Sequence, residues 1–96
     1  MMSELPSQAR VVIIGGGVVG VSCAYHLAKA GWTDCVLLEK NELTAGSTWH
    51  AAGNVPTFST SWSIMNMQRY STELYSNLGH EVDYPMNYNV TGSIRL

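Results

Sequence analysis

The chain has 96 residues, of which 46% are hydrophobic and 12% are charged, and its formal net charge is −2. That length allows at most one domain, and the composition is typical of a globular protein rather than a disordered one. The small acidic excess and the lack of any lysine or arginine cluster argue against a nucleic-acid partner. No apolar run approaches the roughly 20 residues needed to cross a bilayer, so we expect no membrane span.

The first residues and the two cysteines bear on the compartment. Met1–Gln8 is short and polar, and it resembles neither a secretory signal nor an arginine-rich transit peptide. Cys23 and Cys35 match no metal-ligand spacing, which favours buried thiols in a reducing compartment and no metal site. We therefore expect a flexible leader over residues 1–9 and a cytoplasmic location, or the mitochondrial matrix if the source is eukaryotic.

The most informative stretch runs from residue 10 to residue 40. Apolar residues predict a strand over Arg10–Ile14, and a helical pattern follows over Val18–Ala30, with Gly31 as its stop. A second apolar run predicts a strand over Cys35–Glu39. Strand, crossover helix and strand form a βαβ unit, so the predicted fold class is α/β with a Rossmann-like unit.

The glycines between the first strand and the helix indicate a dinucleotide site. Gly15 permits a tight turn, Gly17 lets a pyrophosphate approach the backbone, and Gly20 lets the helix pack closely. The pyrophosphate then meets free N–H groups at the positive end of the helix dipole. The motif alone is weak, and the alternative is a glycine-rich turn in another α/β protein, but its flanking elements are those it requires.

Glu39 follows Gly20 by 19 positions, close to the roughly 20 expected for the acid that binds ribose hydroxyls. A carboxylate suits a free 2′-hydroxyl and repels a 2′-phosphate, which argues against NADP. The alternative is a solvated charge at the end of a strand.

Asn41–Asn54 reads as a loop that is rich in small and hydroxyl residues. Small residues let the backbone approach a ligand, and Ser47 and Thr48 can donate hydrogen bonds to phosphate or ring heteroatoms. An ordinary NAD-binding unit would place another helix at this position, so the loop argues against that class.

The second half of the chain predicts one long helix and one strand. The helix should span Trp62–Leu78, with Ser61 or Ser63 as its cap and Gly79 as its end, and the strand should lie within Asn89–Leu96.

The first two strands are apolar on both faces, whereas one crossover helix covers only one face. We therefore interpret the chain as the N-terminal piece of a longer protein, with residues 10–96 forming an incomplete domain.

Four segments resemble a known family: GGGVVGVSCAYHLAKAG, LLEK, ELTAGSTWHAAG and TGSIRL. They are similar to the N-terminal flavin domain of the dimethylglycine and sarcosine dehydrogenase family, within the D-amino-acid-oxidase-like flavoproteins. The glycine motif is common to many flavoproteins. GSTWHAAG is far more specific, because its histidine is the covalent flavin attachment site in that family.

The resemblance implies FAD rather than NAD, and an FAD-binding βαβ unit followed by the start of the flavin and substrate domain. The glycine turn would contact the pyrophosphate, the acid and its neighbour would lie at the adenosine ribose, and the loop would run along the flavin. The implied cofactor-binding residues are Gly15, Gly17, Val18, Val19, Gly20, Glu39, Lys40, Gly46, Ser47, Thr48, Trp49, His50, Ala51, Ala52, Gly53 and Asn54.

By the same resemblance, His50 carries the flavin covalently. A neutral imidazole nitrogen can add to the activated methyl group of the flavin's benzenoid ring, and an unperturbed imidazole is neutral at pH 7. The alternative is a histidine satisfied by hydrogen bonds within its loop.

The implied reaction is FAD-dependent oxidation of an N-methyl amino acid such as dimethylglycine or sarcosine, with folate as a possible one-carbon acceptor in a later part of the chain. We assign no catalytic residue and no electron acceptor within these residues, and we expect this piece alone to be inactive. Two alternatives stay open, which are a non-catalytic regulatory relative of the same fold and an NAD-dependent dehydrogenase.

Overall fold

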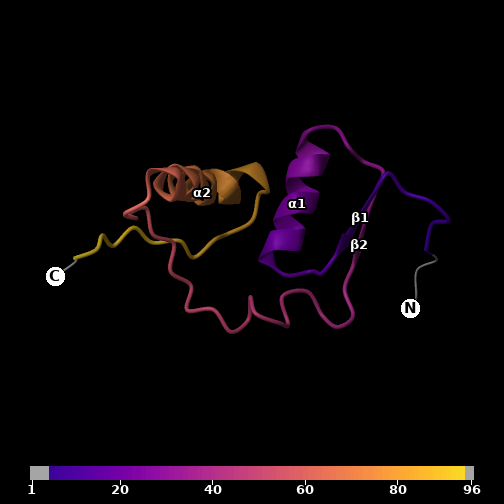
Figure 1. The fold of residues 1–96 in the computed structure, drawn as a ribbon, viewed down its shortest axis with the longest axis horizontal. Helices are drawn as coiled ribbons and strands as arrows, with labels where there is room; N and C mark the ends of the chain where they lie inside the picture. Colours follow the sequence, from indigo (N-terminus) through magenta and orange to yellow (C-terminus); the bar gives the residue numbers. More distant parts are fainter. Residues whose placement is uncertain (1–4, 95–96) are drawn as a thin grey trace. The chain divides into compact units, whose positions relative to one another are not determined.

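A computed structural model describes residues 5–94 of the chain. The chain divides into two compact units, Met1–Ala52 and Gly53–Leu96. The first unit holds two strands and a helix, and the second holds one longer helix (Figure 1). In chain order the elements are β1 (Val11–Ile14), α1 (Val18–Lys29), β2 (Cys35–Leu38) and α2 (Trp62–Glu81).

The first unit is a parallel βαβ unit, which confirms the predicted fold class. β1 pairs in parallel with β2, with Val11 opposite Cys35 and Ile14 opposite Leu38. α1 joins the two strands, contacts both, and lies along one face of the sheet (Figure 1). Each strand is one residue shorter than predicted, and α1 begins at the predicted residue.

Only one face of this sheet is covered by the described part of the chain. Along β1, Val11 and Ile13 are half-buried, whereas Val12 and Ile14 are 54% and 87% exposed. No hydrophobic side chain among residues 5–94 is fully buried. Strands that are apolar on both faces usually lie between two layers of helices. The exposed face of this sheet therefore has the apolar composition of a buried one.

The turn between β1 and α1 needs glycine at two positions for different reasons. Gly15 has a φ of +111° and donates its N–H to the Leu38 carbonyl over 2.8 Å. At Gly20, a β-carbon would overlap the Gly15 carbonyl oxygen and would lie 3.3 Å from the side chain of Ile13. The lack of a side chain at Gly20 therefore allows the first turn of α1 to pack directly on the glycine turn and on β1.

The end of α1 follows the prediction. Gly31 has a φ of +93°, and its N–H donates to the Ala28 carbonyl over 3.0 Å. The next residue, Trp32, donates its N–H to the Leu27 carbonyl over 2.9 Å. This pattern satisfies the last carbonyls of the helix, and it requires a residue that tolerates positive φ.

α2 begins as predicted but ends later. The Ser61 hydroxyl accepts a hydrogen bond from the Ile64 N–H at 3.4 Å, so Ser61 is the cap. The predicted stop at Gly79 is wrong, because the helix continues through it to Glu81. Asp83 instead takes the positive φ, +51°, just beyond the end, and aspartate is among the few non-glycine residues that tolerate it.

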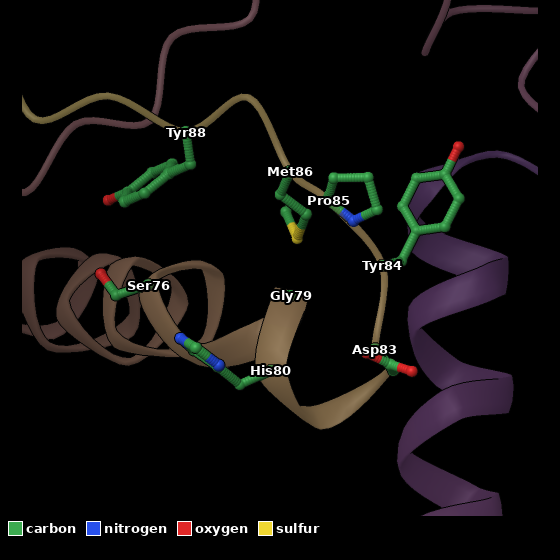
Figure 2. Close-up of a pocket in the computed structure, with 8 residues that line it drawn as sticks. All are labelled: Ser76, Gly79, His80, Asp83, Tyr84, Pro85, Met86 and Tyr88. Carbon is green, nitrogen blue, oxygen red and sulfur yellow. The ribbon is translucent and has the colours of Figure 1, made fainter.

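The chain after α2 turns back on the helix within the second unit. Tyr84 donates its N–H to the Gly79 carbonyl over 3.0 Å, and the rings of Tyr75 and Tyr88 stack with centroids 6.2 Å apart. Figure 2 shows the chain from Tyr84 to Tyr88 passing over the last turns of α2. A β-carbon at Gly79 would lie 3.0 Å from the Tyr84 carbonyl oxygen, so glycine serves close approach there rather than helix termination.

The predicted strand near the C-terminus is wrong for residues 89–94, which are irregular, and residues 95 and 96 lie outside the described range. A strand needs a partner for its backbone groups, and β1 and β2 pair only with each other in the described sheet. Among residues 5–94, no helix has the length and apolar character required to cross a membrane.

Replacing Gly20 by alanine should disrupt the first unit. The new methyl group would collide with the Gly15 carbonyl, and relieving such overpacking costs about 1–3 kcal/mol. Thermal unfolding of the full-length protein, followed by circular dichroism, should show a lower midpoint for Gly20→Ala. Gly46→Ala is the matched control, because nothing lies within 4 Å of a β-carbon at Gly46. Equal midpoints for the two variants would contradict the packing argument.

Candidate dinucleotide-binding site

The glycine turn and the predicted ribose-binding acid are in direct contact. The Gly16 N–H donates to Glu39 Oε1 over 2.8 Å, and the Asn41 N–H donates to Glu39 Oε2 over 2.9 Å. Because neighbouring parallel strands end at the same edge of a sheet, the residues that follow β1 and β2 meet at this edge. The carboxylate is therefore held in one orientation by two backbone donors.

Gly16 has no room for a side chain. It is buried, and a β-carbon on it would lie 2.6 Å from Leu43 Cδ2 and 3.1 Å from Glu39 Cβ. Its carbonyl accepts the Thr44 N–H over 2.9 Å. Both backbone groups of Gly16 therefore bind the segment after β2, a role that the sequence reasoning missed. The sequence signal for this role was the position of Gly16 between Gly15 and Gly17 in a run of three glycines.

The same backbone donors keep Glu39 charged. The N–H of Asn41, followed by that of Gly16, lowers the pKa of the Glu39 carboxyl below its usual value, and Lys40 adds a smaller effect in the same direction. An ionised carboxylate has about four acceptor positions. Two backbone bonds therefore leave capacity for hydroxyl groups of a ligand.

The loop after Glu39 is bound to the N-terminus of α1. The Thr48 hydroxyl oxygen accepts a hydrogen bond from the Val18 N–H at 2.9 Å, across 30 positions of sequence. Thr48 is half-buried, although the other residues of 41–50 are exposed. The predicted loop contains a series of turns, in which Trp49, His50 and Ala51 each donate their N–H to the carbonyl three positions earlier.

His50 is exposed, and its Nδ1 lies 2.8 Å from the Gly46 carbonyl oxygen. A carbonyl can only accept, so Nδ1 is the donor and carries hydrogen. In the neutral ring the Nε2 atom then has the free lone pair. The local hydrogen bond that the sequence offered as an alternative role for His50 is present, and it leaves the second nitrogen of the ring available.

The remaining predicted site residues divide between the two units. The first unit brings Glu39, Val18 and Thr48 together at the glycine turn. Gly53 and Asn54 belong to the second unit. Seven more residues of the predicted set lie in the first unit and are exposed. They are Val19, Lys40, Gly46, Ser47, Trp49, Ala51 and Ala52.

In the described chain, a metal-binding cluster is absent and a hollow lies outside the predicted site residues. Within residues 5–94, no group of three or more histidine, cysteine, aspartate or glutamate side chains could hold a metal ion. A hollow at the end of α2 is lined by Ser76, His80 and Tyr88, among others (Figure 2). It contains none of the predicted cofactor residues.

The arrangement suits a dinucleotide. The first turn of α1 contains no acidic residue, and its N-cap is Gly17, which offers no side chain to the free N–H groups. A helix start of this kind favours an anion, and the charged acid lies beside it. The fold and the site therefore define a dinucleotide-binding βαβ unit.

Comparison with known proteins identifies the family. Residues 10–96 match the model of the DAO family, described as FAD dependent oxidoreductase. The chain belongs to this family. Because the family is described as FAD dependent, the match argues against the NAD-dependent dehydrogenase that the sequence left open.

The relatives are much longer proteins. The chain is 54% identical over 94 residues to human mitochondrial dimethylglycine dehydrogenase, covering 98% of the chain and 11% of that protein. It is 50% identical over 92 residues to the mouse mitochondrial pyruvate dehydrogenase phosphatase regulatory subunit, covering 96% of the chain and 10% of that protein. It is 59% identical over 49 residues to human mitochondrial sarcosine dehydrogenase, covering 51% of the chain and 5% of that protein.

A solved structure supports the fold. The structure of L-amino acid deaminase from Proteus myxofaciens in complex with anthranilate aligns with a TM-score of 0.80 and 30% sequence identity. The alignment covers 86% of this chain and 18% of that one. The likeness supports the fold of the chain, and the match of residues 10–96 shows its family.

The bonds to Glu39 predict an acid-dependent contribution to stability. Because the pKa of Glu39 is lowered in the folded state, its contribution is complete above the usual value of 4.5 and is lost as pH falls through the lower folded value. Thermal midpoints of the full-length protein measured from pH 6 to pH 3 should therefore fall less steeply for Glu39→Gln than for the wild type. Glu42→Gln, which removes another acid of the same loop, should keep the wild-type slope. Identical slopes for all three proteins would contradict the role of Glu39.

Proposed function

We propose that this chain forms the nucleotide-binding part of an enzyme that oxidises an N-methyl amino acid, such as dimethylglycine or sarcosine, with FAD tethered to His50. The observation that carries the proposal is the position of His50 in the GSTWHAAG loop, two residues after the threonine that binds the start of α1. The loop thereby joins the phosphate-binding end of α1 to a histidine whose Nε2 is free.

The chain's own residues would bind the two ends of the cofactor separately. Gly15, Gly17 and Gly20 keep side chains away from the first turn of α1, where Val18 and Val19 would lie at the pyrophosphate. The Val19 N–H would donate to it, because the Val18 N–H already donates to Thr48. At the end of β2, Glu39 would accept hydrogen bonds from the adenosine ribose, with Lys40 beside it. A carboxylate suits a ribose with a free 2′-hydroxyl and repels a ribose with a 2′-phosphate.

His50 would form the tether through Nε2. Its Nδ1 is committed to the Gly46 carbonyl, so the neutral ring presents only Nε2 as a nucleophile. The residues from Gly46 to Asn54 would lie along the flavin, where the small side chains among them permit close contact. FAD, when bound, supplies an acceptor for the hydride that leaves the N-methyl carbon of the substrate.

The substrate assignment comes from the relatives, and the residues for it lie outside this chain. Two of the matched proteins are named dimethylglycine and sarcosine dehydrogenases. Loss of hydride from an N-methyl amine gives an iminium ion, from which water releases formaldehyde or folate takes the one-carbon unit. We assign no catalytic residue within residues 1–96, and we expect this segment to have no turnover by itself. For a eukaryotic source, the proposal includes the mitochondrial matrix.

A second function is supported by a specific similarity. The mouse regulatory subunit of pyruvate dehydrogenase phosphatase matches almost the whole chain at 50% identity. A regulatory protein of this fold would not need an attached flavin to act on a substrate. His50 favours the enzyme, because a permanent flavin tether serves repeated redox turnover.

The tether is tested by denaturing the full-length protein in acid and examining the precipitate for flavin absorbance and fluorescence. We expect flavin to remain with the wild-type protein and to be lost completely in His50→Ala. His26→Ala is the matched control, because His26 Nδ1 also lies 2.8 Å from the carbonyl four positions earlier. A colourless wild-type precipitate would remove the covalent tether from the proposal.

Turnover separates the two functions. With an artificial electron acceptor, the full-length protein should reduce the acceptor when dimethylglycine or sarcosine is added and should form formaldehyde. The absence of both attached flavin and turnover with either amine would favour the regulatory function.

A further inference from the structure

We propose that Thr48 is a positioning residue for flavin attachment, which anchors the loop that carries His50 to the N-terminus of α1. This inference rests on the proposed tether at His50. It concerns the speed with which the tether forms rather than the identity of the attached residue.

The anchor is a single long-range hydrogen bond. The Val18 N–H is one of the first N–H groups of α1, which have no acceptor within the helix. Gly17, the N-cap, provides no side-chain acceptor, and Thr48 Oγ1 takes that place from 30 positions away at 2.9 Å. Thr48 therefore caps a helix to which it is not adjacent in sequence.

The space for this hydroxyl exists because Gly17 lacks a side chain. A β-carbon at Gly17 would lie 3.0 Å from Thr48 Oγ1. The loop therefore contacts Gly17 through Thr48. A second bond, from the Thr44 N–H to the Gly16 carbonyl at 2.9 Å, fixes the preceding part of the loop.

A short, hydrogen-bonded segment connects Thr48 to His50. The His50 N–H donates to the Ser47 carbonyl over 3.1 Å, and the Ala51 N–H donates to the Thr48 carbonyl over 3.3 Å. His50 Nδ1 is held by the Gly46 carbonyl. The ring is thus fixed relative to Thr48, and Thr48 is fixed relative to the phosphate-binding end of α1.

This geometry affects attachment because the reacting atoms must be aligned. The Nε2–carbon bond forms while a flavin methyl C–H and the imidazole N–H lose their protons, and two electrons remain on the flavin until dioxygen accepts them and gives hydrogen peroxide. Misplacing reacting groups by about 1 Å can cost about a hundredfold in rate. A loop released from α1 should therefore attach flavin slowly even when FAD is bound.

The test measures binding and attachment separately in full-length protein prepared without flavin. FAD affinity is measured by fluorescence quenching, and covalent incorporation at saturating FAD is followed by flavin fluorescence of the denatured protein. Thr48→Val, which keeps the shape and removes the hydroxyl, should slow incorporation by about tenfold, with less than about a threefold change in affinity. Thr48→Ser should restore at least a third of the wild-type rate, and Thr33→Val, the same hydroxyl deletion at an exposed residue before β2, should incorporate like the wild type.

Wild-type incorporation by Thr48→Val would overturn the inference, as would a loss of affinity without slower incorporation at saturation. Amide exchange provides a test that does not depend on the variant folding. The Val18 amide of the flavin-free wild-type protein should be protected, because it donates to the Thr48 hydroxyl, and rapid exchange there would also overturn the inference. Failure of the wild type to retain any flavin after denaturation would instead remove the proposed tether at His50.

Discussion

The hydrogen bond between the Gly16 N–H and the Glu39 carboxylate is the interaction on which the site depends. It joins the residue after one parallel strand to the residue after the other, 23 positions away in sequence. It forms because β1 and β2 are in register, which brings the Leu38 carbonyl to the Gly15 N–H as well. The glycine turn and the Glu39 carboxylate therefore have one geometry, which backbone atoms determine.

The loop after Glu39 extends this arrangement without regular secondary structure. Gly16 and Val18 bind the loop through backbone groups that a glycine turn and a helix start leave unpaired. A loop held in this way can be exposed along most of its length and still position a histidine. That explains how a unit with no fully buried hydrophobic side chain among residues 5–94 can hold this loop in a defined conformation.

Glycine has three different roles in this chain, and its pattern in the sequence does not distinguish them. Gly31 provides a positive φ at the end of α1, as predicted. Gly79 lies within α2, where the Tyr84 carbonyl passes too close for a β-carbon, and Asp83 takes the positive φ instead. The helix end was misplaced because close approach by a later segment is a tertiary contact that the local sequence does not encode.

The sequence by itself determined the βαβ unit, the positions of its elements, and the conjunction of glycines, acid and histidine loop. Hydrophobic periodicity and turn chemistry are local, and they were sufficient for Val18–Lys29 and for the cap at Ser61. The tertiary structure decided that Gly16 binds both Glu39 and Thr44, that Thr48 caps α1, and that residues 89–94 have no strand partner. Those features depend on which backbone groups remain unpaired after folding, and that is settled only when distant segments meet.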